Sequence, residues 1–166
     1  MLNWYAAYVK SRHEFVAQSE LGRKGVQTFL PTIKKLNQWK DRKKLVEFPL
    51  FPGYLFVNVP SYPSEFANVL RTRGVVSILA SGQDGPVPVP QDEIESLKIM
   101  LTSGGDGVNV YPHLKSGALV RVKRGPLKGA RGAVMNSEGE HIFVVNIDIL
   151  GRSIGIKVYA NDLEPE

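Results

Sequence analysis

Histidine and cysteine side chains would most readily do chemistry in a chain of this kind, as acid–base groups, nucleophiles or metal ligands. The three histidines are His13, His113 and His141, and no two of them stand at the spacing of a metal-binding pair. The chain has no cysteine, which excludes a thiol nucleophile, a disulfide framework and any cysteine-ligated metal site. We therefore expect no catalytic residue, no metal, no cofactor and no enzymatic activity.

Two glycine-rich segments, TSGGDGVN at 102–109 and GPLKG at 125–129, could in principle hold a phosphate. Neither has the spacing GxxxxGK[ST] or GxGxxG between a strand and a helix, which a nucleotide-binding loop requires. The pattern therefore favours a protein that acts by binding another macromolecule.

Positive charge is concentrated in one short segment. The chain has a formal net charge of +5, and the segment 34–44 alone carries a charge equal to that total. Its basic residues, set against Asp41 alone, are Lys34, Lys35, Lys40, Arg42, Lys43 and Lys44. One interpretation is a solvated mobile loop. The other is a basic flap, with Lys40, Arg42 and Lys43 as nucleic-acid contacts, that is attracted to phosphates in a salt-sensitive way.

The segment 47–59, EFPLFPGYLFVNV, predicts a strand with two different faces, because side chains alternate between the faces of a strand. The aliphatic face consists of Leu55, Val57 and Val59. Tyr54 and Phe56 lie on the other face, and Gly53 marks a bulge or a close approach. Both faces could be core. Alternatively, Phe51, Tyr54 and Phe56 form an exposed apolar patch for a partner, since aromatic side chains are preferred anchors of interfaces.

The elements around this strand predict a mixed first domain. Ser11 and Glu14 match an S-x-x-E capping box that would start a helix running to about Lys24, and Gly25 would end it. The other expected elements are strands at 3–9, 26–30, 44–47 and 75–80, a short helix at 63–71 and a helix from Gln91 with an apolar stripe.

A change in composition after residue 101 predicts a second domain. The segment 102–114 is glycine-rich and polar, as expected of a flexible linker. Residues 115–166 contain four short strands at roughly ten-residue spacing, which predicts a small β-barrel. We therefore expect an α+β fold: domain 1–101, linker 102–114 and barrel 115–166. No N-terminal signal and no membrane span are expected, which places the protein in the cytoplasm.

The order of these segments resembles the NusG family. WYAAYVKSR, VQTFLP, PLFPGYLFVNV, RTRGVVSIL and GPVPVPQDEIESL are similar to the NusG N-terminal (NGN) domain, an antiparallel sheet flanked by helices. GALVRVKRGPLKGARG at 117–132 is similar to the KOW motif, with Gly125, Pro126, Gly129 and Gly132 at the expected positions. The flap length and the segments PLFPGYLFV and RTRGV resemble specialised paralogues of the RfaH type.

The resemblance implies binding of the first domain to the clamp helices of bacterial RNA polymerase. The matching residues are Tyr8, Phe51, Tyr54 and Phe56, together with Leu97 and Leu101 from the last helix. It also implies contact of the non-template DNA strand with Lys10, Arg23, Thr72 and Arg73. Glu20 stands where RfaH-like relatives have a base-contacting histidine, and a carboxylate there repels phosphate.

For the barrel, the resemblance implies docking to ribosomal protein NusE or to termination factor Rho through Leu127, Leu150 and Arg152. The alternative is that both leucines fill turns of the barrel. The whole pattern predicts a monomeric cytoplasmic transcription elongation and antitermination factor that suppresses pausing or termination. The competing prediction is an RNA-binding or ribosome-associated KOW protein.

Overall fold

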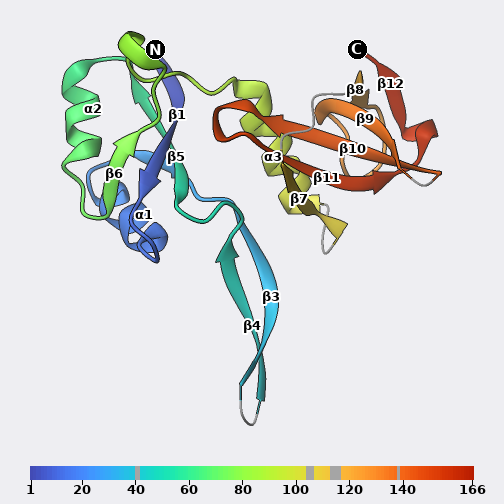
Figure 1. Ribbon diagram of the computed structural model, residues 1–166, viewed down its shortest axis with the longest axis horizontal. Coiled ribbons are helices and arrows are strands. Elements are labelled where there is room, and N and C mark those ends of the chain that lie inside the picture. Colours follow the sequence, from blue (N-terminus) through green and yellow to red (C-terminus); the bar gives the residue numbers. More distant parts are fainter. Residues whose placement is uncertain (40–41, 104–106, 113–116, 138) are drawn as a thin grey trace. The chain divides into compact units, whose positions relative to one another are not determined.

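The computed structural model describes residues 1–39, 42–103, 107–112, 117–137 and 139–166, and the chain divides into two compact units. The units are Met1–Pro88 and Val89–Glu166. Both combine helices with antiparallel sheets, which confirms the predicted α+β class (Figure 1). Among the residues described, no helix is both long enough and apolar enough to cross a membrane.

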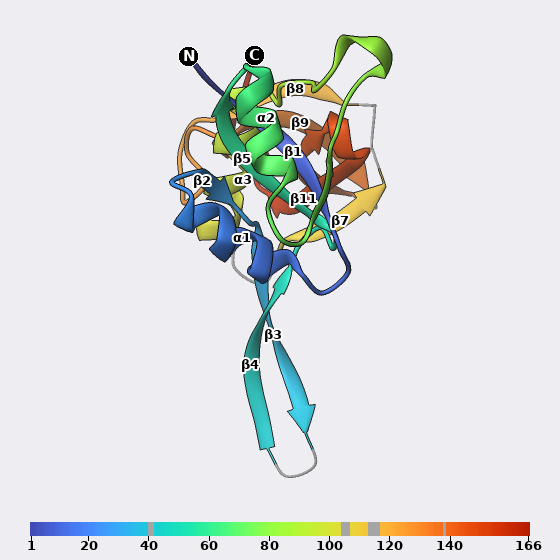
Figure 2. The same ribbon diagram turned by 90° about the vertical axis from the view of Figure 1, so that its left-hand side faces the viewer.

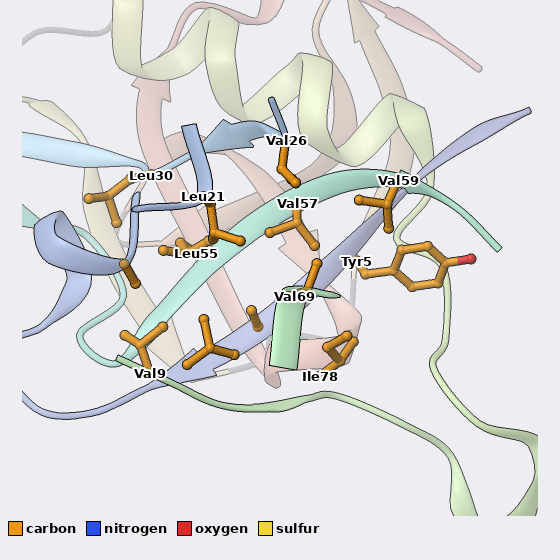
Figure 3. Close-up of a cluster of buried hydrophobic side chains, with 13 residues drawn as sticks. Tyr5, Val9, Leu21, Val26, Leu30, Leu55, Val57, Val59, Val69 and Ile78 are labelled. Atoms are coloured by element: carbon orange, nitrogen blue, oxygen red, sulfur yellow. The ribbon is translucent and has the colours of Figure 1, made fainter. Parts of the chain in front are cut away.

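The first unit is built on a four-stranded antiparallel sheet with the order β2-β5-β1-β6. The strands are β1 (Leu2–Val9), β2 (Gln27–Phe29), β5 (Tyr54–Pro60) and β6 (Val75–Ile78), and the helices are α1 (Glu14–Arg23) and α2 (Pro63–Leu70). The predicted aliphatic face of β5 is confirmed as core, because Leu55, Val57 and Val59 are buried with side chains of both helices (Figure 3). Burial of these aliphatic groups is the main stabilising contribution to this unit.

The start of α1 corrects the predicted capping box. The N-cap residue is His13, and no side chain caps the helix. Glu14 is buried, and its Oε2 accepts a hydrogen bond from the Gly53 backbone N–H at 2.9 Å. The spacing of Ser11 and Glu14 allowed a local cap, but a partner far along the chain takes the carboxylate instead. Gly25 ends the helix as predicted, with φ +80°.

The basic segment forms a long two-stranded ribbon rather than a loop with a short strand. β3 (Thr32–Trp39) pairs with β4 (Arg42–Pro49) in antiparallel register over eight residue pairs, from Thr32↔Pro49 to Trp39↔Arg42. Both views show the ribbon leaving the sheet of the first unit (Figures 1 and 2). The backbone hydrogen bonds between β3 and β4 determine where the lysines on each strand point.

The second unit contains a six-stranded antiparallel sheet with the order β12-β8-β9-β10-β11-β7. The strands are β7 (Asn109–Pro112), β8 (Ala118–Val122), β9 (Arg131–Ser137), β10 (Glu140–Ile147), β11 (Arg152–Val158) and β12 (Leu163–Pro165). The four predicted strands correspond to β8 to β11. β7 lies in the segment that we predicted to be linker, and it pairs with β11. The described residues include the 3-10 turns η1 (Gly82–Asp84), η3 (Asp148–Leu150) and η4 (Ala160–Asp162).

Helix α3 (Gln91–Ser103) groups with the second unit, whereas we predicted domain 1–101 to include it. The Arg131 N–H donates to Ser96 Oγ at 2.9 Å, and the Arg131 guanidinium pairs with Asp92 at 3.1 Å. The Asp148 N–H donates to Glu93 Oε1 at 3.3 Å. These polar interactions attach α3 to β9 and to the end of β10, so the boundary between the units falls between Pro88 and Val89.

Candidate functional site

The second face of the first sheet carries a pair of tyrosines. Tyr8 on β1 lies directly opposite Tyr54 on β5, and their ring centroids are 5.4 Å apart in a tilted arrangement. Tyr8 is 42% exposed and Tyr54 is half-buried. A partly exposed aromatic pair of this kind offers both an apolar ring surface and hydroxyl groups to a partner.

Gly53 fixes the position of this pair. The Val9 N–H donates to the Gly53 carbonyl at 2.8 Å, and the Tyr54 N–H donates to the Phe51 carbonyl at 3.0 Å. A Cβ atom at Gly53 would lie 3.2 Å from Tyr8 Cε1, and the φ angle of +89° is one that favours glycine. Backbone and ring therefore approach closely here, as the sequence predicted.

We expect Glu14→Ala to destabilise the first unit, because it leaves the buried Gly53 N–H without its acceptor. The cost of such an unsatisfied donor is about 1–3 kcal/mol. Glu14→Gln, which retains an oxygen acceptor, should recover most of this loss. Urea unfolding followed by tryptophan fluorescence measures both variants, because Trp4 and Trp39 are the only tryptophans and both belong to the first unit.

Phe51 and Phe56 correct the expectation of an exposed patch. Phe51 is 3% exposed, and Phe56 is fully buried. The Phe56 ring stacks on Phe29 of the neighbouring strand β2, with centroids 6.0 Å apart. Of the aromatic residues predicted on this face, the tyrosines alone reach the surface, because Phe56 lies at the centre of the sheet and Tyr54 at the start of its strand.

The two leucines predicted on the last helix differ in exposure. Leu97 is fully buried, together with Ile94 and Met100, on the face of α3 that carries the predicted apolar stripe. Leu101 is half-buried. Leu97 therefore has a packing role in this structure, and Leu101 keeps some accessible surface.

Two of the predicted DNA contacts are brought together by the sheet. The Lys10 N–H donates to the Gly74 carbonyl at 2.8 Å, so Lys10 and Arg73, both exposed, lie on adjoining loops. Arg12, which the sequence did not indicate, follows in the same loop with an unusual φ of 65° and an exposed side chain. Cations on adjoining loops suit contact with a phosphate backbone.

Thr72 and Arg23 are placed differently. Thr72 is 4% exposed, its hydroxyl donates to the Asn68 carbonyl at 3.0 Å, and Lys24 Nζ donates to the same hydroxyl at 2.9 Å. Arg23 is exposed and pairs with Glu20 at 3.5 Å. Thr72 thus joins the ends of α1 and α2, and the carboxylate of Glu20 lowers the local charge beside Arg23.

Of the three flap residues predicted to contact nucleic acid, Lys43 is exposed on β4. Lys40 lies outside the described residues. Arg42 lies on β4 opposite Trp39, and only its backbone is described.

In the second unit, Leu127 and Leu150 are both buried, at 6% and 8% exposure. Arg152 is exposed, and its Nη1 donates to the Leu150 carbonyl at 3.1 Å. Leu150 and Arg152 thus share one turn, and the burial of both leucines agrees with a role in filling turns of the sheet.

A pocket of about 290 Å³ lies within the second unit, but its charges are already paired. Its lining includes the apolar Val120 and Val145 and the charged Asp92, Arg131 and Glu166. Arg131 pairs with Asp92 at 3.1 Å and with Glu166 at 3.0 Å. Within the described part of the chain, no group of three potential metal ligands gathers.

A family model described as "Transcription termination factor nusG" matches residues 2–98, which is more than half of the chain. The chain belongs to the NusG family. This membership confirms the family resemblance of the sequence. Two bacterial proteins that align over almost the whole chain carry the description "Transcription termination/antitermination protein NusG".

The NusG of Thermus thermophilus is 29% identical over 177 residues, which cover 95% of this chain and 95% of that protein. The NusG of Chlamydia trachomatis serovar D is 26% identical over 176 residues, covering 99% and 92%. A solved structure of Thermotoga maritima NusG matches with a TM-score of 0.53 and 22% identity, covering 99% of this chain and 97% of that one. This last likeness supports the fold alone.

Proposed function

We propose that this NusG family member is a transcription elongation and antitermination factor that binds bacterial RNA polymerase through its first unit. The observation that supports this most is the Tyr8–Tyr54 pair, in which Tyr8 is exposed and Tyr54 half-buried although most of their two strands is buried. The expected target is the clamp helices of the polymerase, as the family resemblance implies. Of the first-unit residues that the resemblance assigns to this contact, Tyr8 and Tyr54 keep accessible surface.

The proposed action is mechanical. A protein bound to the clamp and reaching across the DNA cleft would restrain the clamp motion that accompanies pausing, so pausing or termination would be suppressed without a catalytic residue. Lys10 and Arg73 would contact phosphates of the non-template strand from their adjoining loops. The flap length and the PLFPGYLFV and RTRGV segments support a specialised paralogue of the RfaH type.

The second unit would recruit a further protein, NusE or Rho. Arg152 is the exposed member of the predicted contact set, so it would make the direct contact. Leu127 and Leu150 are buried and would support the turns that present it.

The test is a pull-down of RNA polymerase by the wild-type chain and by the double variant Tyr8→Ala/Tyr54→Ala. We expect polymerase recovery to fall at least tenfold, because truncation of interface tyrosines commonly removes about 2 kcal/mol or more of binding free energy. Phe56 is left intact, since its truncation would destabilise the sheet and could mimic a loss of binding.

Tyr62→Ala is the matched control, because this tyrosine is 60% exposed and belongs to the N-terminal end of α2. Its polymerase recovery should equal that of wild type. If wild type recovers ribosomes or RNA but no polymerase, the competing interpretation as an RNA-binding or ribosome-associated protein is correct and our proposal is wrong.

A further inference from the structure

The ribbon of β3 and β4 carries positive charge on both of its faces. Residues directly opposite each other in an antiparallel pair share a face, and neighbours along a strand alternate. Lys34 and Lys43 therefore lie on one face, and Lys35 and Lys44 lie on the other. All four lysines are exposed. A ligand that used all four cations would have to present negative charge along both sides of the ribbon.

An apolar pair lies between the lysines of the first face. Leu36 and Leu45 are directly opposite each other, and they are 68% and 55% exposed. The neighbouring pair on this face toward the base of the ribbon is Lys34 with Glu47, and Lys43 belongs to the neighbouring pair toward the tip. The face thus has an apolar centre with a lysine on each side along the ribbon.

An isolated two-stranded ribbon is marginally stable in water, and leaving leucine side chains in contact with water is also unfavourable in free energy. Both views of the first unit show the ribbon extending away from the sheet and its helices (Figures 1 and 2). The lysines and leucines on its two faces are exposed and can contact a partner. A partner that covered the leucines would also stabilise the ribbon.

We propose that the β3–β4 ribbon binds duplex DNA in the major groove, with Leu36 and Leu45 against the base edges and the four lysines at the phosphates. The major groove admits a two-stranded ribbon, and its two phosphate backbones form two negatively charged walls. Lys34 and Lys43, on the leucine face, would contact the phosphate backbones from inside the groove. Lys35 and Lys44, on the other face, would contact the phosphates at the outer edges of the groove. A single strand has one backbone and would engage the cations less completely.

The leucine pair gives this site a chemical preference. A leucine side chain cannot form hydrogen bonds, but it gains free energy by burying a methyl group, and thymine is the base that presents one in the major groove. The ribbon should therefore prefer a duplex that contains thymine to the same duplex in which uracil replaces it. The expected difference is about fourfold in affinity for each thymine methyl group buried.

The charge arm of the test measures anisotropy of a labelled A·T-rich duplex with the full-length chain over a range of salt concentrations. The quadruple variant Lys34→Gln/Lys35→Gln/Lys43→Gln/Lys44→Gln should bind more weakly. Its plot of log affinity against log salt should be shallower by about 0.9 for each phosphate that the variant no longer neutralises. A slope equal to that of wild type overturns the proposal. So does equal affinity of wild type for the duplex and for its single strands.

The leucine arm compares thymine-containing and uracil-containing duplexes. Wild type should discriminate between them, and Leu36→Ala/Leu45→Ala should bind both equally. Val76→Ala, which truncates an exposed valine on β6, should discriminate as wild type does. Absence of discrimination by wild type overturns the proposal, as does sedimentation that shows the leucine pair joining two copies of this chain.

These measurements use free DNA and no polymerase, so their outcome is independent of the proposed polymerase binding. A chain that binds polymerase through Tyr8 and Tyr54 but ignores duplex DNA would refute the ribbon site alone. Circular dichroism shows whether each ribbon variant keeps the sheet of the first unit.

Discussion

Replacing Gly132 by alanine is expected to unfold the second unit while the first unit stays folded. Gly132 lies on β9, and a Cβ atom there would be 2.2 Å from the Val144 carbonyl oxygen and 3.1 Å from Phe143 Cζ. The oxygen belongs to the backbone of the neighbouring strand β10, so a rotamer change cannot relieve the clash. Overpacking of a well-packed core costs about 1–3 kcal/mol, and we expect the upper end or more here.

Gly139→Ala is the matched control, because it distinguishes the effect of a steric clash at the added Cβ from the effect of an unfavourable backbone conformation. Gly139 has φ +81°, and no atom lies within 4 Å of its added Cβ. Alanine there should cost only about 1–2 kcal/mol, from the left-handed backbone. The far-UV circular dichroism of Gly132→Ala should show loss of strand signal, while its tryptophan fluorescence resembles that of wild type. Equal stability of the two variants would mean that the close approach at Gly132 is absent.

Strands with strong alternation could be predicted from the sequence alone. Leu55, Val57 and Val59 are spaced two apart between prolines, and the structure buries all three. The sequence could not show that the tyrosines are more exposed than the phenylalanine on the same face. Alternation predicts which face of a strand a side chain lies on, but it does not predict how exposed that side chain is. Tyr54 and Phe56 share a face, yet one ring reaches the surface and the other stacks on Phe29, a residue far earlier in the chain.

The ribbon and the start of α1 show what local patterns miss. The lysines of 34–44 hid the strands, because runs of adjacent charged residues at 34–35 and 40–44 favour a solvated loop as much as an exposed strand. For Glu14, local spacing suggested a cap at Ser11, but the partner is the Gly53 N–H, 39 residues along the chain. A buried donor elsewhere in the fold outweighed the local cap, and no pattern within one segment contains that information.

The segment around α3 shows a similar limit. Its apolar stripe was predicted correctly, since Ile94, Leu97 and Met100 are buried. Which unit holds the helix depends on Ser96 and on the pairing of Arg131, which are 35 residues apart in the chain. Flexible composition after residue 101 suggested a boundary there, whereas the packing places it at Pro88, within a proline-spaced segment.

Phe56→Ala is expected to lower the free energy of unfolding of the first unit by about 3–5 kcal/mol, the usual cost of truncating a buried phenylalanine. The ring is fully buried and stacked on Phe29, so its removal leaves a cavity between β5 and β2. Urea unfolding monitored by tryptophan fluorescence measures this loss, because Trp4 is a buried residue of the same sheet.

Tyr54→Ala, on the same strand and face, distinguishes a role in binding from a role in the core. It should cost only about 1 kcal/mol of stability, mainly because the Tyr8 ring no longer packs on an aromatic neighbour, while it weakens polymerase recovery. If Phe56→Ala instead kept wild-type stability and abolished polymerase binding, the phenylalanine would be displayed to the partner and the buried packing described above would be wrong. The two substitutions thus test whether Tyr54, at the start of β5, contributes to binding while Phe56, in the middle of the same strand, contributes to the stability of the fold.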